Sequence, residues 1–498
     1  MGHTNSSNLG IGPARFGAGA LACLTLAVAA LLLVPGPAMA AKRENVVFIY
    51  LDDVSAPQFQ YMSEVRKLAR EGTTFEQSIV TDPLCCPARA SMLTGLFAHN
   101  HTVVGKPREY NVLRKRYPET LPVWMQDAKY RTGFVGKYVN GYGTRGNPES
   151  DVPKGWDEFL AFTKHGEYKY TRGKFARGNS KDGARIANFP AKKNFHVEQV
   201  LRESATDFIR SSVKDKKRFF LWYSSPLPHA EAEGGPPIPE RQDIGRNAGE
   251  RAPRTPAFNE LDMSDKAPGA LRAPLDELDI QFIDNNWRGT LDGLRTANRS
   301  IGKLRKTLQK EGVADETTII FTADNGFHFG EHRLARGKNT PYEESILVPT
   351  WVVGSEFPAG NVVKDPVSNL DIPATILAAG KADAPWQIEG FPLQDQTAGT
   401  DPNRRIPLER LYACDIVPDQ CFKGVRTARY AYWERFATGG AELYDLSDDP
   451  YQTENRLGDP LYANVEAQLR QELLGLKNCD GESCFGVGLG ELPAPVGE

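Results

Sequence analysis

Residues 46–53 read VVFIYLDD, and this stretch indicates the fold class of the 498-residue chain. Its first six residues form a continuous apolar run, which predicts a buried β-strand. The run ends on an acidic pair, Asp52-Asp53. Three further apolar runs end close to polar residues in the same way, at positions 132–135, 219–223 and 318–321. Because open α/β sheets place their sites at the carboxyl ends of the strands, the pattern predicts an α/β domain with its site there.

Helical spacing between these strands supports the same fold class. Five apolar residues recur on one face of a predicted helix, namely Leu291, Leu294, Ile301, Leu304 and Leu308. The length of the chain predicts one large domain and a smaller one. Composition changes near residues 398–403, beyond which the chain has short aromatic strands and a closing amphipathic helix. We therefore expect a large α/β domain over residues 41–397 and a small α+β domain over residues 398–498.

Residues 231–274 interrupt the alternation of strands and helices. They are rich in proline, glycine and charged residues. Loops of this length are usually either functional or disordered. The sequence leaves two alternatives open here, a disordered surface insertion and a rim over the site.

The first forty residues have the features of a secretory signal peptide. Arg15 precedes an apolar run over residues 18–34, and Ala38-Met39-Ala40 supplies the small-x-small pattern that signal peptidase reads. We expect cleavage after residue 40 and a secreted or extracytoplasmic product, with retention as an N-terminal membrane anchor as the alternative. No other stretch is apolar enough to cross a bilayer. A net charge of −3 argues against a nucleic-acid partner.

Cysteine spacing agrees with export. Short-range cysteine pairs in a secreted protein indicate disulfides. Two such pairs occur near the C-terminus, Cys414 with Cys421 and Cys479 with Cys484.

Cys85 begins the pattern C-x-P-x-R, which ends on Arg89. Adjacent cysteines rarely bridge each other, so we expect Cys86 to be a buried free thiol. Arg89 lies one helical turn after Cys85, and its guanidinium can reach back to that residue. The pentapeptide alone is also consistent with a small buried thiol at the start of a helix.

The strand ends offer oxygen ligands for a metal ion. The adjacent carboxylates of Asp52 and Asp53 repel each other unless a cation neutralises them, and Asp324-Asn325 repeats the arrangement at another strand. Oxygen ligands suit calcium or magnesium rather than zinc, and about five or more of them favour Ca²⁺ over Mg²⁺. For the acidic pair by itself, the alternative is a polar strand end that caps the next helix.

Basic side chains follow other strands and loops. Lys137 follows the predicted strand over residues 132–135, His229 follows the strand at 219–223, and Lys338 lies in a loop. A single lysine is usually a solvated surface charge, but two lysines beside a metal and an arginine suit a tetrahedral anion. Histidine can donate a proton near neutral pH, although a lone histidine is more often structural.

Together these elements resemble the type I sulfatases of the alkaline phosphatase-like superfamily. The motifs occur in that family's order: Asp52-Asp53, Cys85-x-Pro87-x-Arg89, Gly136-Lys137-Tyr138, Pro228-His229, Asp324-Asn325-Gly326 and Gly337-Lys338-x-x-x-Tyr342-Glu343-Glu344. The stretches Cys85-Cys86-Pro87, Ala98-His99-Asn100-His101 and Glu331-His332-Arg333 are most similar to the N-acetylglucosamine-6-sulfatase and heparan endosulfatase branch. The resemblance implies a large mixed, mostly parallel sheet sandwiched by helices, with a smaller C-terminal α+β domain.

The resemblance also implies the chemistry. A formylglycine-generating enzyme would oxidise Cys85 to Cα-formylglycine, whose hydrate attacks the sulfur of a sulfated small molecule or glycan and forms a covalent sulfo-enzyme. The family's metal ligands correspond to Asp52, Asp53, Cys85, Asp324 and Asn325, and its catalytic residues to Cys85, Arg89, Lys137, His229 and Lys338. Two alternatives stay open, a phosphonate monoester or phosphodiester hydrolase on the same scaffold and a non-catalytic binder of sulfated glycans with Cys85 unmodified.

Two positions depart from the family pattern, Ala88, where serine is commoner and the chemistry is not affected, and the position two residues after Lys137. Many members have a histidine two residues after the lysine that corresponds to Lys137, whereas this chain has Val139 and then Asn140. The base for sulfate elimination is consequently open. Asn140 and His328 are candidate substrate contacts, and His328 or His101 is a candidate base, each histidine with the alternative of an ordinary loop residue.

Overall fold

The computed structural model describes residues 43–105, 109–143, 150–163, 166–189, 195–399, 401–412, 414 and 418–497. The signal peptide predicted over residues 1–40 lies outside the described residues. Arg43–Glu498 form one compact unit, and the domain boundary after residue 397 stays a prediction. Among the described helices, none combines the length and apolar composition that crossing a membrane requires.

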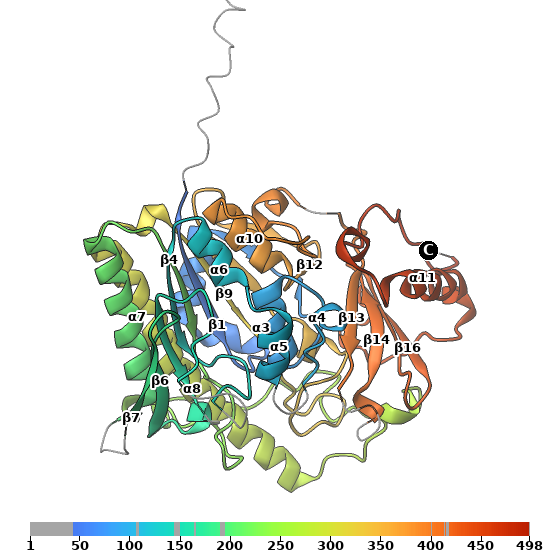
Figure 1. Ribbon diagram of the computed structural model, residues 1–498. Coiled ribbons are helices and arrows are strands. Elements are labelled where there is room, and N and C mark those ends of the chain that lie inside the picture. Colours follow the sequence, from blue (N-terminus) through green and yellow to red (C-terminus); the bar gives the residue numbers. More distant parts are fainter. Residues whose placement is uncertain are drawn as a thin grey trace, which may run out of the picture. The chain divides into compact units, whose positions relative to one another are not determined.

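A ten-stranded sheet organises most of this unit (Figure 1). Its strands are β1 (Asn45–Leu51), β2 (Thr73–Phe75), β4 (Arg131–Gly136), β5 (Glu158–Phe162), β6 (Gly173–Asn179), β7 (Gly183–Phe189), β8 (Phe219–Ser224), β9 (Thr317–Ala323), β10 (Thr350–Val353) and β11 (Asn361–Val363). They are ordered β11-β2-β10-β9-β1-β8-β4-β5-β6-β7. The central strands from β9 to β5 are parallel, whereas β10, β6 and β7 are antiparallel to their neighbours. The predicted large, mixed and mostly parallel sheet is confirmed.

Helices cover both faces of this sheet. Side chains alternate along β1, so Val47, Ile49 and Leu51 enter one core and the residues between them enter the other. The first core includes residues of α2 (Ser63–Glu71), α7 (Val197–Lys214) and α8 (Glu277–Lys310). The second includes residues of α3 (Cys85–Thr94), α5 (Glu109–Arg116), α6 (Leu121–Asp127) and α10 (Asp371–Gly380). All five residues of the predicted helix face from Leu291 to Leu308 are buried in the first core.

The C-terminal part contains a second, antiparallel sheet. Its strands, in spatial order, are β13 (Ile406–Arg410), β14 (Phe422–Arg426), β15 (Tyr430–Glu434) and β16 (Ala441–Asp445). Helix α11 (Ala463–Leu476) buries its predicted apolar face against this sheet through Val465, Leu469, Leu473 and Leu476. Both predicted disulfides, Cys414–Cys421 and Cys479–Cys484, are present.

Gly136 ends β4 in a conformation that only glycine adopts easily. Its φ is 126°, and a Cβ at this position would lie 1.8 Å from the backbone oxygen of Ser224. We expect Gly136→Ala to lower the free energy of unfolding by about 2 kcal/mol or more, and to displace Lys137, the next residue. Chemical denaturation measures the first effect. Gly249→Ala is the control, because a Cβ there meets no atom within 4 Å, and equal losses in the two variants would contradict the prediction.

Candidate active site

The carboxyl ends of four neighbouring strands meet at one edge of the large sheet. Strands β9, β1, β8 and β4 are adjacent and parallel, so the residues that follow them lie together. Helix α3 begins at Cys85 beside the same edge (Figure 1). Asp52, Asp53, Cys85 and Asp324 are all buried, and their potential ligand atoms lie within 4.8 Å of one another. We call these residues, with Asn325, the acidic centre.

The acidic centre has the donor set of a hard-cation site. Asp53 adopts a left-handed backbone (φ 61°), and its N–H donates to Oδ1 of Asp324 at 3.1 Å. Asn325 Nδ2 donates to Oδ1 of Asp53 at 2.7 Å, while Asn325 Oδ1 is buried without a hydrogen-bond partner among the described residues. A buried, unsatisfied oxygen beside carboxylate oxygens suits a divalent cation. The predicted oxygen ligands Asp52, Asp53, Asp324 and Asn325 therefore fit calcium or magnesium, and residue 85 would join them through an oxygen and not through its sulfur.

Two lysines neutralise the first pair of carboxylates. Lys137 Nζ donates to Oδ2 of Asp52 at 2.6 Å, and Lys338 Nζ donates to Asp53 Oδ1 and lies 2.8 Å from Cys85 Sγ. Burial alone would raise the pKa of both carboxyl groups, but the lysines lower each pKa below its usual value. Burial alone would likewise lower the pKa of the lysines, but the carboxylates raise it. All four groups are therefore charged at neutral pH.

Arg89 bonds to residues at the ends of three strands. Its Nε donates to Oδ2 of Asp324 at 2.9 Å, and its Nη1 donates to the backbone oxygen of Lys137 at 2.7 Å and to Oγ of Ser224 at 2.6 Å. The described residues show no hydrogen bond between Arg89 and the Cys85 thiol. Arg89 Nη2 is buried without a hydrogen-bond partner among them, and its reach to residue 85 stays a prediction. The guanidinium ties together the ends of β9, β4 and β8.

Cys85 and Cys86 are free and buried, but they face different surroundings. The Cys85 thiol lies 3.5 Å from Oδ1 of Asp52. Burial raises the pKa of this thiol well above its usual value, and the nearby lysines offset only part of that effect. Cys86 enters the second hydrophobic core, where burial raises its pKa to about 12. Both thiols are neutral at physiological pH, and the expected buried thiol at Cys86 is confirmed.

His229 is held beside the acidic centre by Tyr168, a residue that sequence reasoning missed. His229 Nδ1 donates to the backbone oxygen of Ala230 at 2.7 Å, and its Nε2 lies 3.5 Å from Oδ2 of Asp53. Tyr168 stacks on the imidazole with ring centroids 3.9 Å apart and planes inclined by 12°. The Lys137 ammonium lies 5.1 Å from the centroid of the same tyrosine ring. No motif marks Tyr168, because its contacts join segments that are distant in the chain.

His328, His101 and Asn140, the candidates for the base or a substrate contact, lie in different surroundings. His328 is buried with Nε2 bonded to Oγ1 of Thr340 at 2.7 Å, and burial lowers its pKa to about 4. His101 is buried with Nε2 bonded to Oγ of Ser91 at 3.1 Å, and burial lowers its pKa to about 3. Within the described residues, neither histidine bonds to the acidic centre. Asn140 Oδ1 is buried and has no hydrogen-bond partner among the described residues. Asn140 therefore remains a candidate substrate contact.

Residues 231–274 are attached to the loop that carries Lys338. Several hydrogen bonds join the two segments, among them Asn259 N–H to Gly330 O (2.8 Å), His332 N–H to Ala257 O (2.8 Å) and Arg333 Nε to Glu260 O (2.7 Å). This attachment agrees with a rim beside the site and not with a detached insertion.

Comparison with known proteins identifies the family. The sulfatase family model matches residues 44–382, and the model described as N-sulphoglucosamine sulphohydrolase, C-terminal, matches residues 330–479. The chain therefore belongs to the sulfatase family, a class of sulfuric ester hydrolases. Within that class it is a type I sulfatase similar to the N-acetylglucosamine-6-sulfatase and extracellular sulfatase branch.

Three relatives show this similarity. The N-acetylglucosamine-6-sulfatase of Homo sapiens is 28% identical over 93% of this chain and 90% of that protein. A Sulf-1 homologue of Caenorhabditis elegans is 30% identical over 72% of this chain, and the extracellular sulfatase SULF-1 homologue of Drosophila melanogaster is 28% identical over 70% of it. The matches span only 49% and 31% of these two longer proteins.

Solved structures share the fold. A protein in complex with its substrate D-glucosamine-2-N,6-O-disulfate has a TM-score of 0.69 and 20% identity, covering 87% of this chain and 97% of that one. The phosphonate monoester hydrolase of Agrobacterium radiobacter has a TM-score of 0.65 and 20% identity, covering 87% and 95%. At these identities the likeness concerns the fold alone.

We expect a divalent cation to stabilise the protein, because it relieves the repulsion among the buried carboxylates. Adding Ca²⁺ to protein treated with EDTA should raise the melting temperature by several degrees, measured by differential scanning fluorimetry. Asp324→Asn should lose most of that increase. Asp207→Asn, at a carboxylate whose side chain is 74% exposed, should keep it. An equal increase in all three proteins would contradict a cation site at Asp324.

Proposed function

We propose that this sulfatase hydrolyses the sulfate esters of glycans or aryl alcohols through a formylglycine derived from Cys85. The position of Cys85 carries the proposal: it is the first residue of α3, buried beside the acidic centre, with Lys338 Nζ 2.8 Å from its sulfur. A buried neutral thiol is a poor nucleophile, whereas an aldehyde hydrate at that place offers a hydroxyl group. The sulfur marks where the hydrate oxygens would lie. Maturation requires a formylglycine-generating enzyme, which is the protein partner we propose.

The reaction would proceed in two steps. In the first, a hydrate hydroxyl at position 85 loses its proton and bonds to sulfur, the bond between sulfur and the ester oxygen breaks, and His229 or Lys338 protonates the departing alcohol. In the second, a base takes the proton of the remaining hydroxyl, the aldehyde C=O forms again, and the bond between the carbon of residue 85 and the sulfate oxygen breaks, so that sulfate leaves. Water then hydrates the aldehyde. Serine at position 85 would lack the second hydroxyl, so its sulfate ester would have no internal route of release.

The surrounding side chains would bind the sulfate and place the proton donor. Lys338 Nζ lies 2.8 Å from Cys85 Sγ and Lys137 Nζ bonds to Asp52, and both ammonium groups would hold the sulfate oxygens. His229 Nδ1 is fixed by its bond to a backbone oxygen, so Nε2 is the nitrogen that would carry the transferred proton. Charge on the sulfate would be shared with a divalent cation, Ca²⁺ in our proposal, whose ligands would be Asp52, Asp53, Asp324, Asn325 and a formylglycine oxygen at position 85.

The relatives guide the substrate and location that we propose. The human relative is named for N-acetylglucosamine 6-sulfate, and one structural neighbour was solved with a disulfated glucosamine. A sulfated glucosamine unit is therefore the substrate class we propose. Export to an extracytoplasmic compartment agrees with the extracellular relative and with the two disulfides.

Cys85→Ser should abolish sulfate ester turnover, measured with an aryl sulfate. Cys86→Ser is the matched control, because it removes the neighbouring buried thiol and should retain turnover. Mass analysis of the peptide that contains both cysteines should show a lower mass than the unmodified sequence, as expected for oxidation of one thiol to an aldehyde. An intact Cys85 thiol in active protein, or sustained turnover by Cys85→Ser, would sink the mechanism. An intact Cys85 thiol in protein that shows no turnover would instead favour the glycan-binder alternative.

Parallel assays separate the two hydrolase alternatives. We expect kcat/KM for an aryl sulfate to exceed that for the matched aryl phosphonate monoester, and a 6-sulfated glucosamine to be desulfated. Both esters carry a single negative charge, so charge does not separate them, and the expected ranking rests on the match of residues 44–382 to the sulfatase family model. A higher kcat/KM for the phosphonate would overturn the assignment to sulfate.

A further inference from the structure

Lys338 lies in a loop whose backbone shape must be imposed by its surroundings. The loop covers residues 326–345, which we call the Lys338 loop. Three of its non-glycine residues have left-handed backbones, His332 (φ 51°), Arg333 (φ 58°) and Asn339 (φ 71°). Such conformations persist only where the surrounding contacts hold them. Two buried histidines of the loop, His328 and His332, supply such contacts.

His328 closes the loop around Lys338. Its backbone N–H donates to the oxygen of Gly337 at 2.8 Å, one residue before Lys338. Its Nε2 bonds to Oγ1 of Thr340 at 2.7 Å, two residues after Lys338. The lysine is thus bracketed by two bonds to one buried residue.

His332 is the second anchor, and it carries charge. Its Nδ1 lies 2.8 Å from Oε2 of Glu260, and its Nε2 lies 3.5 Å from Oε2 of Glu344. The ring is 1% exposed and stacks on Tyr342 with centroids 3.8 Å apart. Burial alone would lower the pKa of His332, but the two carboxylates raise it to about 9. The charged His332 imidazole lies between two carboxylates. It therefore joins Glu260, in residues 231–274, to Glu344, near the end of the Lys338 loop.

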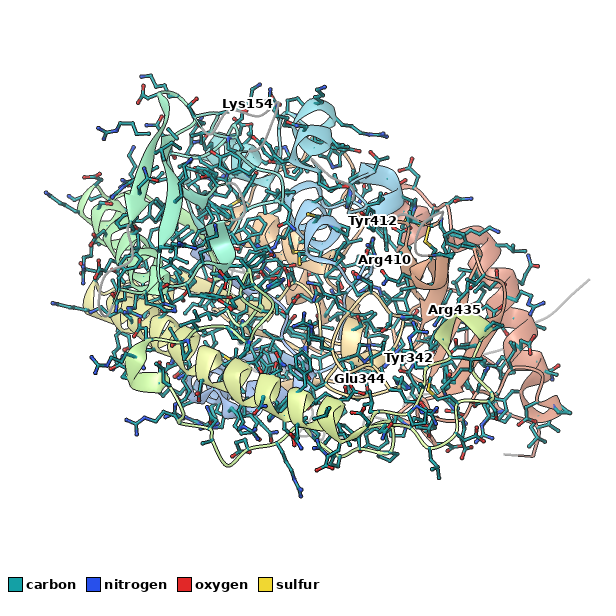
Figure 2. All side chains as sticks on the ribbon, turned by 90° about the horizontal axis from the view of Figure 1, so that it is seen from below. Lys154, Tyr342, Glu344, Arg410, Tyr412 and Arg435 are labelled. Atoms are coloured by element: carbon teal, nitrogen blue, oxygen red, sulfur yellow. A yellow bond between two sulfur atoms is a disulfide. The ribbon has the colours of Figure 1, made fainter. Side chains whose placement is uncertain are left out.

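The C-terminal strands contact Tyr342, the residue on which His332 stacks, and its neighbour Glu343. Tyr342 donates its hydroxyl to Oε2 of Glu442 at 2.8 Å, and Arg435 Nε lies 3.3 Å from Oε1 of the same carboxylate. Tyr342 and Arg435, two of the partners of Glu442, can be followed in Figure 2 together with Glu344. Arg426 of β14 pairs with both oxygens of Glu343, the residue after Tyr342, at 2.8 and 2.9 Å.

We propose that His332 is a positioning residue for Lys338, and that the C-terminal strands take part in this positioning through Tyr342. The proposal rests on the catalytic role of Lys338 proposed above. A lysine has a flexible four-carbon side chain, so a fixed backbone is needed to bring its ammonium reproducibly to Cys85 and Asp53. His332 acts on the reaction only through that backbone.

A double-mutant cycle tests this coupling. His332→Gln, Lys338→Ala and the double variant are compared by kcat for an aryl sulfate. We expect His332→Gln to lower kcat by about tenfold or more in the wild-type background, and by less than about threefold when Lys338 is already absent, because both changes remove one function. Equal losses in the two backgrounds would overturn the proposal. Glu260→Gln replaces His332→Gln in the cycle if the latter does not fold.

Tyr444→Phe provides the matched control. Tyr444 also donates its hydroxyl to Oε2 of Glu442 at 2.8 Å, but it belongs to β16 and not to the Lys338 loop. Tyr342→Leu should lower kcat with little change in KM, whereas Tyr444→Phe should leave kcat within about twofold of wild type. Equal losses in both would indicate general weakening of the C-terminal sheet and overturn the proposed link.

Hydrogen exchange tests the positioning without turnover. The peptide that contains Lys338 should exchange its amide hydrogens faster in His332→Gln than in the wild type or in Tyr444→Phe, measured by mass spectrometry. Unchanged exchange would overturn the positioning role even in an active enzyme. Absence of wild-type turnover with faster exchange in His332→Gln would instead overturn the proposed function and leave the anchor standing.

Discussion

Repulsion among three buried carboxylates is the constraint on which this site depends. Asp52 and Asp53 follow β1, and Asp324 follows β9, its parallel neighbour. The register pairs Leu51 with Ala323, so the strands deliver their acidic residues at the same level. Like charges at this distance in a poorly solvated site would be strongly unfavourable without cations. The sheet therefore fixes both the place of the site and its need for positive charge.

The basic residues around the acidic centre supply this positive charge. Lys137 and Lys338 meet one carboxylate each, and Arg89 meets Asp324 while bonding to two other strand ends. A divalent cation on the carboxylates would leave the two ammonium groups available to sulfate oxygens. Arg89, which is 1% exposed and bonded through Nε and Nη1 to residues at three strand ends, would stay in place. Charge balance thus distinguishes Arg89, which holds the strand ends, from Lys137 and Lys338, which would bind the substrate.

Much of the site could be predicted from local sequence. The strand that ends on Asp52-Asp53 is marked by its apolar run, and Cys85 with Arg89 by a five-residue motif. The placement of Tyr168 and His328 could not be predicted in this way. Tyr168 stacks on His229, and His328 faces Thr340 instead of the acidic centre. Such contacts depend on how separate segments pack, which no short pattern encodes.

The sequence by itself determined the kinds of side chain available and the strand ends that present them, because burial and apolar periodicity are local properties. It also marked Cys85 as the residue around which the chemistry would be arranged. Only the tertiary structure decided which partners each charge has. Arg89 bonds to Asp324, and Lys338 owes its place to a loop held by the rim and the C-terminal strands. The physical reason is that a buried charge takes its partner from whatever the packed chain brings within a few ångströms.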